Sequence, residues 1–453
     1  MFKRTLEKKL AEWKANPKGK PLVIRGARQT GKTTLIRNFA KQYEVFIELN
    51  LEKDAHRKIF SEIKDAKEII QSIEGVSNKV IVPGKTLLFL DEIQNSIQAI
   101  KFLRYFHEEM PMLHVITAGS LLEVRMRREG WSFPVGRVDF LYLYPVTFEE
   151  FLAALGEEIL LKAVREFEMG GKLPMPLHEK TLNLLADYIC VGGMPEAVGE
   201  YLATKSFVSI KQYHDALSTS FKEDFAKYAS ESEVQQLKLI WDKIPYEIGA
   251  RIKYSRLSGG NYQARQMSNA FDILHEAMLI ERVHPTTQTA PPLIKKSKYA
   301  PKAIYLDIGL CSHSLGLTRD QIRDKIIDPK YDGALSEEFI GQELLASDDY
   351  NRKELFFWVR EEKGASSEID YLIQKEGRLI PVEVKSGSQG SLKSLHQFLH
   401  RSNTNFGIRF YTGETKIEEQ SVNLPTGHAL KYKLLSLPLY LVFRLGELVK
   451  QGL

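Results

Sequence analysis

Hydrophobic and polar positions alternate in two different patterns along the chain. In the first 150 residues, short apolar runs alternate with segments whose apolar residues recur every three or four positions. The recurring segments predict helices, of which Phe2–Trp13 and Lys32–Tyr43 are the clearest. The apolar runs predict strands at Pro21–Ile24, Glu44–Leu51, Thr86–Leu90 and Leu113–Thr117. Strands that alternate with helices indicate a parallel sheet that is covered on both faces.

The pattern changes twice more. From about residue 148 to residue 229 it is helical throughout, interrupted by the turn residues Gly192-Gly193-Met194-Pro195. From about residue 234 it reads as helix, turn, longer helix and strand-like residues, which is the order of a winged helix. The last third predicts helices at 333–347 and Leu392–His400, and strands at Leu355–Val359, Glu368–Ile373, Leu379–Val384 and Phe406–Thr412.

Composition narrows the class of protein. The chain has 453 residues, with 43% apolar and 27% charged residues, which is typical of soluble globular domains. Its two cysteines exclude a disulfide framework and a thiolate zinc site. The charged N-terminus carries no apolar leader, and no apolar run is long enough to span a membrane. We expect a cytoplasmic protein.

A phosphate-binding loop follows the first predicted strand. Gly26-Ala27-Arg28-Gln29-Thr30-Gly31-Lys32-Thr33-Thr34 fits the pattern GxxxxGK[ST] and precedes a predicted helix. Average residue usage gives such a match by chance about one time in a hundred. The backbone N–H groups would surround the phosphates of ATP, Lys32 would reach the β- and γ-phosphates, and Thr33 would bind Mg²⁺.

Carboxylates end a second strand of the same region. Asp91 and Glu92 follow the apolar run Leu87–Leu90, about 60 residues after the loop. Asp91 would hold Mg²⁺, and Glu92 would act as the general base that polarises the attacking water. Ser120 follows another apolar run, where it either contacts the γ-phosphate or is a small turn residue. Arg137 is a candidate arginine finger or sensor, with a surface charge as the alternative.

These motifs resemble those of a known family. The segments GARQTGKTT, LLFLDEIQ, ITAGS and VGR followed by LYPVTFEEF look like prokaryotic ATPases of the AAA+/STAND type, whose C-terminal region is known as domain of unknown function 4143. The likeness continues through YICVGGMPEAV, GALSEEFIGQELL and EIDYLI…VEVKSG. It implies an ATPase core, a helical lid, a winged helix and a nuclease-like end, and it supplies no substrate.

The positive charge of the chain is concentrated in its middle. Residues 251–302 contain nine Lys or Arg and three acidic residues, while the whole chain has a net charge of +5. Clustered positive charge favours contact with DNA phosphates. The alternative is a docking module with solvated lysines.

The last third contains a D…ExK pattern typical of PD-(D/E)XK nucleases. Asp370 and Glu383, on neighbouring predicted strands, would share one Mg²⁺, and Lys385 would position the water or offset charge. Glu337 and Gln397, on the flanking helices, could support the site. A chain of this length yields about one such pattern by chance, so the strand context carries the prediction, and the sequence leaves open an ordinary hairpin or an inactive nuclease fold.

We therefore expect an α/β chain with four parts: a parallel-sheet P-loop ATPase core at 1–150, a helical lid at 151–232, a winged helix with a basic connector at 233–300, and a nuclease-like domain at 301–453. The predicted function is Mg-dependent ATP hydrolysis coupled to DNA binding and, if the last domain is active, cleavage. A homo-oligomer fits this class of ATPase. The alternative is a nucleotide-dependent switch whose C-terminal modules only bind partners.

Overall fold

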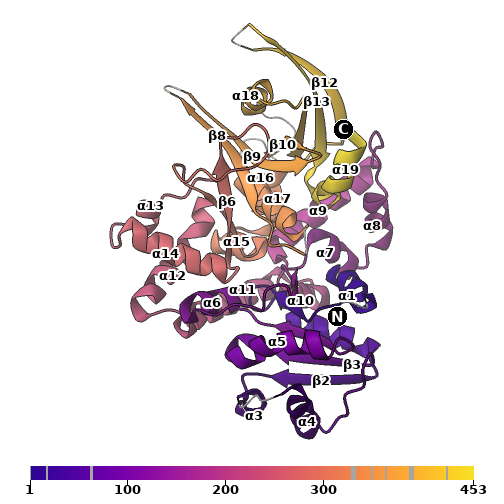
Figure 1. The fold of residues 1–453 in the computed structure, drawn as a ribbon. Coiled ribbons are helices and arrows are strands. Elements are labelled where there is room, and N and C mark those ends of the chain that lie inside the picture. Colours follow the sequence, from indigo (N-terminus) through magenta and orange to yellow (C-terminus); the bar gives the residue numbers. More distant parts are fainter. Residues whose placement is uncertain are drawn as a thin grey trace. The chain divides into compact units, whose positions relative to one another are not determined.

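The computed structural model describes residues 2–16, 19–61, 65–327, 333–347, 350–362, 365–386, 392–424 and 427–452 (Figure 1). The chain divides into two compact units. The first contains residues 1–144 with the short segments 276–279 and 348–352, and the second contains the remainder. The structure thus groups into one unit the three segments that the sequence predicted after the ATPase core. No helix in the described ranges is long and apolar enough to cross a bilayer.

The first unit is built on a five-stranded sheet in the order β2-β3-β4-β1-β5, and every neighbouring pair is parallel. Its strands are β1 (Leu22–Arg25), β2 (Val45–Asn50), β3 (Thr86–Asp91), β4 (His114–Ala118) and β5 (Asp139–Tyr142). The sequence predicted the first four. It gave no bounds for β5, which is a short run of four residues.

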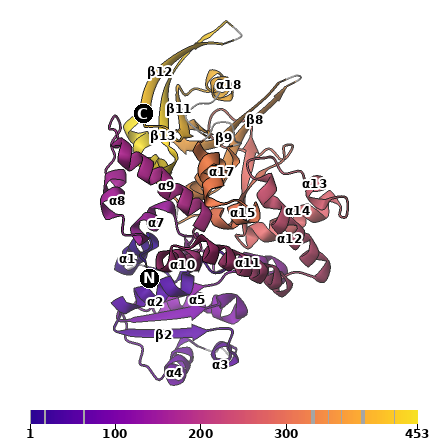
Figure 2. The same cartoon turned by 180° about the vertical axis from the view of Figure 1, so that it is seen from behind.

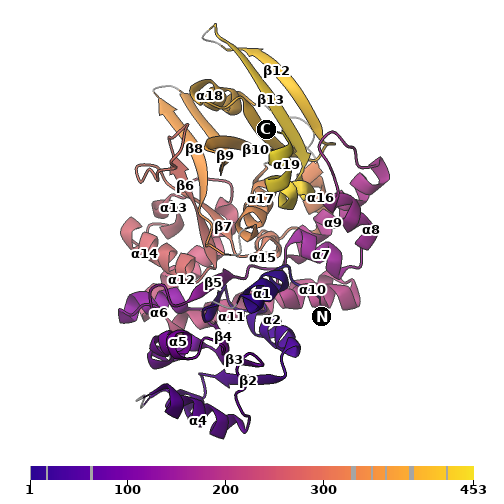
Figure 3. The same cartoon turned by 45° about the vertical axis from the view of Figure 1, so that its right-hand side comes forward.

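Helices cover both faces of this sheet, as its apolar strands require. One face packs against α1 (Leu6–Ala15) and α2 (Lys32–Phe39), which contribute Leu10, Trp13 and Leu35 to the core. The other packs against α4 (Ala66–Ser77), α5 (Ile97–Glu109) and α6 (Leu122–Glu129). Figure 3 shows α1 and α2 on one side of the strands and α5 on the other. The short α3 (Asp54–Lys58) has no buried residue.

The second unit contains an eight-stranded mixed sheet in the order β12-β13-β11-β10-β9-β8-β6-β7. Its strands are β6 (Ile280–Thr286), β7 (Lys302–Tyr305), β8 (Leu355–Glu362), β9 (Ala365–Lys375), β10 (Arg378–Val384), β11 (Phe406–Tyr411), β12 (Lys416–Asn423) and β13 (Ala429–Pro438). Helix α18 (Lys393–Arg401) lies beside the strands of this sheet, as Figure 2 shows. Its residues Leu395, Phe398 and Leu399 belong to the hydrophobic core formed with one face of the sheet.

The remaining helices of this unit begin with a helical region and continue into the suspected winged helix. They are α7 (Phe148–Ala154), α8 (Glu158–Arg165), α9 (Met175–Val191), α10 (Pro195–Thr204), α11 (Phe207–Asp224), α12 (Glu231–Lys243), α13 (Tyr254–Ser258), α14 (Ala264–Glu276), α15 (Ile308–Ser314), α16 (Arg319–Ile327), α17 (Ala334–Ala346) and α19 (Leu445–Gly452). The order α12, α13, α14 and β6 matches the predicted order of elements, whereas the antiparallel pairing of β6 with β7 was not predicted. However, β6 also pairs with β8, so the expected boundary at residue 300 falls within one sheet.

Helix α17 is buried on nearly all sides, and three of its polar residues bond the backbone of other segments. Three of its side chains accept hydrogen bonds from backbone N–H groups of other segments: Glu338 from Tyr305 at 2.7 Å, Gln342 from Ile308 at 2.8 Å and Glu343 from Phe148 at 2.9 Å. Buried backbone donors need such partners. Bonding to the surrounding backbone therefore explains these three polar residues of the helix.

The Gly192-Gly193 turn is tied to the rest of the second unit by Asp307. This carboxylate is fully buried and accepts hydrogen bonds from the N–H of Gly193 at 2.5 Å and of Leu310 at 3.0 Å. A Cβ at residue 192 would lie 2.1 Å from Asp307 Oδ1, which explains the glycine there. The turn therefore depends on one buried acceptor.

Replacing Asp307 by alanine should destabilise the second unit by about 2–5 kcal/mol, because at least two buried N–H groups lose their acceptor at about 1–3 kcal/mol each. Ser206, the N-cap of α11, accepts a single bond from Ser209. Ser206→Ala is the matched control and should cost about 1 kcal/mol. Urea unfolding followed by far-ultraviolet circular dichroism measures both, and equal losses would show that Asp307 is an ordinary cap.

Candidate active sites

The predicted phosphate-binding loop connects β1 to α2 in the described geometry. Gly31 is the N-cap of α2 with a φ of +91°, a conformation that favours glycine. At residue 26 a Cβ would lie 2.3 Å from the carbonyl oxygen of Leu143, so only glycine fits. Thr30 Oγ1 donates to the carbonyl of Ala27 at 2.9 Å and fixes the turn. The N–H groups at the start of α2 thus form an anion-binding site.

Lys32 and Thr33 lie where the motif predicts. Lys32 Nζ donates to the carbonyl oxygens of Gly26 at 2.9 Å and Ala27 at 2.7 Å, so the amine folds back over the loop. Thr33 Oγ1 donates to Asp91 Oδ2 at 3.0 Å. Desolvation lowers the pKa of Lys32 to about 8, opposed by Glu92 and Asp91. The loop thus brings together the cation and both oxygen groups expected to hold ATP and Mg²⁺.

The remaining nucleotide-site residues follow β3 and β4 at the same edge of the sheet, because all the strands are parallel. Burial raises the pKa of Asp91, helped by Glu92 and opposed by the bond from Thr33. Glu92 has a φ of +53°, held by its N–H donating to Asp91 Oδ1 at 3.0 Å. Ser120 is buried, and its hydroxyl has no hydrogen-bond partner among the described residues. An unpartnered buried hydroxyl at this edge fits a phosphate ligand.

The structure does not bring Arg137 to the loop of its own chain. It precedes β5, which runs parallel to β1 with Leu22 opposite Asp139, so it lies where the strands begin. The loop lies where β1 ends, four residues or about 13 Å further along. Arg137 Nε donates to Glu108 at 2.7 Å. The finger and the sensor role of Arg137 both stay predictions, and its position favours a finger that acts on a second chain.

Two residues of the nucleotide region were not predicted. Arg4 donates to the carbonyl oxygens of Thr30 at 3.1 Å and Tyr144 at 2.7 Å, and so braces the loop. Gln94 donates a hydrogen bond from its amide to the carboxylate of Glu92. Gln94 could have been suspected because it lies two residues after Glu92, whereas nothing in the charged N-terminus distinguishes Arg4 from its neighbours.

In the second unit, a β-bulge positions Asp370. Strand β9 pairs Leu372 with Phe356 and Ile369 with Trp358, so two residues of β9 lie opposite the single residue Phe357 of β8. Bulges redirect side chains and are frequent beside active sites. Asp370 Oδ2 accepts the N–H of Val384 at 2.8 Å, next to Glu383. Asp370 and Glu383 also face each other by register, since β9 and β10 pair in steps up to Tyr371 opposite Val382.

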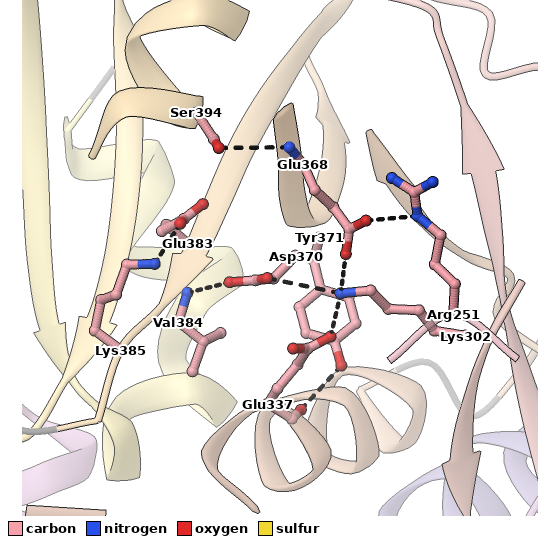
Figure 4. A network of polar contacts seen from close by, with 10 residues as sticks. All are labelled: Arg251, Lys302, Glu337, Glu368, Asp370, Tyr371, Glu383, Val384, Lys385 and Ser394. Carbon is pink, nitrogen blue, oxygen red and sulfur yellow. Dashed lines mark hydrogen bonds and ion pairs between the residues drawn. The ribbon is translucent and has the colours of Figure 1, made fainter. Parts of the chain in front are cut away.

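Figure 4 shows the acidic cluster that results, formed by Glu337, Glu368, Asp370 and Glu383. Lys385 Nζ donates to Glu383 Oε1. Lys302 Nζ lies 2.7 Å from Glu337 Oε1, 2.6 Å from Glu368 Oε1 and 3.7 Å from Asp370 Oδ1. Gln397 bonds Arg360 at 2.8 Å instead. The structure therefore brings together the predicted Asp370, Glu383, Lys385 and Glu337, and it adds Lys302 and Glu368.

Burial makes this cluster electrostatically unusual. It raises the pKa of Glu337 and of Glu383 to about 8, with Asp370 adding to both shifts and the neighbouring lysines opposing them. Burial alone would lower the pKa of Lys302, but Glu337, Asp370 and Glu368 outweigh it and raise the pKa. Perturbed carboxylates that share one buried site indicate a functional centre or a structural ion network.

The fit of a divalent ion to this cluster depends on which carboxylate oxygens are already bonded. Glu383 is 4% exposed, and its Oε2 has no hydrogen-bond partner in the described part of the chain. Such an oxygen beside Asp370 suits a cation. Yet within the described ranges no group of three or more His, Cys, Asp or Glu side chains is arranged to hold a metal ion. One oxygen each of Glu337 and Glu368 contacts Lys302 instead, and the other oxygen of Glu368 accepts a bond from Arg251.

Several basic side chains of residues 251–302 pair with carboxylates of the same chain. Arg251 bonds Glu368 at 2.7 Å, Arg282 bonds Asp272 at 2.6 Å, Arg256 lies 3.2 Å from Glu247, and Lys295 pairs with Glu354. Lys253, Arg265 and Lys298 are exposed. The segment therefore offers fewer free cations than its composition suggested.

Three family models match consecutive parts of the chain. Residues 18–152 match the model described as an AAA domain. Residues 182–321 match a domain of unknown function, DUF8612, and residues 332–429 match another, DUF4143. No curated protein matches the chain.

Solved structures with a similar backbone are distant. A Walker-type ATPase of Pyrococcus abyssi has 14% identity and a TM-score of 0.43, over 70% of this chain and 96% of that one. The ORC2 protein of Aeropyrum pernix has 16% identity and a TM-score of 0.33, over 76% and 96%. DnaA from Aquifex aeolicus has 13% identity and a TM-score of 0.27, over 59% and 86%.

The assignment rests on the family models and on the geometry of the loop, which agree for the same residues. The matched segment 18–152 contains the loop, Asp91 and Glu92, and the segment 332–429 contains the acidic cluster from Glu337 to Lys385. The chain therefore joins a P-loop ATPase domain of the AAA type to a C-terminal domain of the DUF4143 family.

Proposed function

We propose that this ATPase acts on DNA, and that its C-terminal domain hydrolyses phosphodiester bonds under the control of the nucleotide state. The observation that carries the proposal is the bulge at Asp370, which places a carboxylate beside the buried, unpartnered oxygen of Glu383. An ordinary charged hairpin would not bury Glu383 to 4% exposure. Both cysteines are free thiols, as expected in the cytoplasm.

At the C-terminal site, Asp370 and Glu383 would hold a divalent ion, which supplies an activated water and a Lewis acid. Lys385 lies against Glu383 and keeps its charge, because Glu383 and Asp370 raise its pKa more than burial lowers it. Its ammonium can neutralise charge on the phosphate and orient the water. Lys385 directly follows β10, where its N–H donates to the carbonyl oxygen of Phe410 at 2.9 Å, and its amine lies on the same side as the carboxylate of Glu383, which it contacts.

At the nucleotide site, each residue has one task. Lys32 would exchange its bonds to the loop carbonyls for the phosphates of ATP, while Thr33 and Asp91 would bind Mg²⁺ and Ser120 the γ-phosphate. Glu92 would accept the proton of the attacking water once Gln94 releases it. Arg137 lies at the end of the sheet where the strands begin, away from the loop, and would contact the nucleotide bound by a second chain in a homo-oligomer.

A specific observation favours the alternative function. The buried amine of Lys302 already compensates three of the four carboxylates, which would suit a nucleotide-dependent switch whose nuclease-like fold only binds partners. Cleavage with a divalent ion separates the two functions.

DNA binding should depend on the exposed basic residues Lys253, Arg265 and Lys298. Replacing all three by alanine should weaken binding to all sequences and lower the slope of log affinity against log salt by about 3. Fluorescence anisotropy with a labelled duplex at several salt concentrations measures this. Bound DNA should also raise ATP turnover several-fold.

A matched triple variant removes the same charge from paired positions, namely Arg256, Arg282 and Lys295. It should change the salt slope much less, because these side chains are held by acidic neighbours. An equal change in both triple variants, or none in either, would contradict DNA contact through this segment.

A further inference from the structure

The acidic cluster is filled by a side chain from a distant segment. Lys302 is the first residue of β7, and its side chain is only 3% exposed. Its amine lies within 2.7 Å of oxygens from Glu337 on α17 and Glu368 on β9, and 3.7 Å from Asp370 (Figure 4). Three converging carboxylates around one cation is an arrangement that divalent ions also take. Here the cation belongs to the chain.

We infer that Lys302 is a built-in cation that occupies the cluster in place of a divalent metal ion, so that metal reaches Glu337, Glu368 and Asp370 only when the Lys302 side chain withdraws. The inference rests on the proposed phosphodiester-cleaving site, because it concerns the carboxylates of that site. It adds to the proposed function that the ammonium of Lys302 and a divalent ion compete for the same carboxylates.

Two further observations indicate that Lys302 takes the place of a cation in the acidic cluster and does not merely touch it. The second oxygen of Glu368 accepts a bond from Arg251 at 2.7 Å, so both of its oxygens are bonded within the chain. By contrast, Glu383 Oε2 is buried and has no hydrogen-bond partner among the residues that the structure describes. The carboxylate oxygens that face Lys302 are thus paired, whereas the described residues offer Glu383 Oε2 no hydrogen bond.

The position of Lys302 in the fold allows it to withdraw. Strand β7 is four residues long and lies at the edge of the eight-stranded sheet as described, next to β6. It follows the connector that contains Pro291 and Pro292. The bond from Tyr305 to Glu338 anchors the far end of β7, so Lys302 at its first residue can withdraw by a change of rotamer and a shift of that end, without opening the rest of the sheet.

Metal binding tests this directly. Full-length protein without nucleotide is titrated with Mn²⁺, and the free ion is measured by electron paramagnetic resonance. The chain carries Asp91→Asn so that the ATP site contributes little. Lys302→Met, which keeps the length of the side chain and removes its charge, should bind Mn²⁺ at least about tenfold more tightly than the parent protein. Adding Glu368→Gln should reverse most of the gain.

A matched control removes the other lysine of the cluster. Lys385→Met should give a smaller gain, because Lys385 pairs with Glu383 and its removal leaves Lys302 in place. Equal Mn²⁺ affinity in the parent and Lys302→Met would overturn the inference. So would an equal gain in both lysine variants, since it would reflect net charge alone.

Stability provides a second readout if Lys302→Met folds poorly. Without Lys302, the crowded carboxylates should lower the melting temperature in EDTA, and Mn²⁺ should restore it, with a larger rise than in the parent. A loss that no divalent ion restores would contradict the inference. If wild type cleaves DNA but Lys302→Met binds Mn²⁺ no more tightly than the parent, the proposed function stands and this inference fails. If Lys302→Met binds Mn²⁺ more tightly but no variant cleaves DNA, this inference stands and the proposed function fails.

Discussion

Lys32→Ala should leave the chain unable to bind ATP tightly, with affinity falling at least about a hundredfold. Lys32 Nζ folds over the loop at 2.7–2.9 Å from the carbonyl oxygens of Ala27 and Gly26, so it is already placed to meet a phosphate there. A charge-assisted bond to phosphate is about twice as strong as a neutral one. Equilibrium titration with a fluorescent ATP analogue measures the loss, and the exposed Lys41→Ala on the same helical segment should bind as wild type does.

Glu92→Gln should separate binding from hydrolysis in the same assay. The amide keeps the shape of the carboxylate and cannot accept a proton, so affinity should stay within about threefold while kcat falls by about 10²–10⁴. Phosphate release under saturating ATP measures the rate. Equal turnover by wild type and Glu92→Gln would remove Glu92 from the role of base.

The fold of the ATPase domain was largely predictable because its signals are local. A buried strand, a loop with glycines at two positions and an amphipathic helix each occupy a few consecutive residues, and β1, the loop and α2 lie where they were expected. The placement of Arg137 was not predictable. Its distance from the loop depends on β5 lying beside β1, and that pairing is between residues more than 100 positions apart.

The C-terminal site was predictable in its motif but not in its electrostatics. Asp370, Glu383 and Lys385 were identified from alternating strands, while the bulge that redirects Asp370 leaves no mark in the sequence. Lys302 was counted among the cations of a DNA-binding segment, because composition records charge and not partners. The structure shows it buried against Glu337 and Glu368.

Helix α17 illustrates the same limit. Its polar residues would predict one solvated face, yet Glu338, Gln342 and Glu343 are all buried. Each accepts a backbone bond from a segment that the sequence could not place beside it. Polar residues in a helix thus indicate either solvent or a buried backbone donor, and only the fold distinguishes them.

Asp370→Asn should abolish metal-dependent cleavage of DNA, with a loss of at least about a hundredfold. Even outer partners of metal ligands cost about 10–100-fold when they are replaced, and Asp370 is a proposed direct ligand. Asparagine can still accept the N–H of Val384, which Asp370 accepts at 2.8 Å, so the β10 end should keep its place. Loss of activity with an unchanged melting temperature would then reflect the lost charge.

Glu376→Ala is the matched control, because Glu376 lies exposed in the turn between β9 and β10 of the same hairpin. It should cleave at the wild-type rate. ATP turnover in Asp370→Asn should also stay at the wild-type level without DNA, since the loop, Asp91 and Glu92 are untouched.

The most direct test of the account is the rate at which the full-length protein cleaves plasmid and linear DNA in Mg²⁺ or Mn²⁺, with and without ATP, for wild type, Asp370→Asn and Glu376→Ala. The account predicts cleavage by wild type and Glu376→Ala that depends on the divalent ion and changes with ATP, and none above background by Asp370→Asn. Equal cleavage by Asp370→Asn, or no cleavage by wild type under any of these conditions, would contradict it.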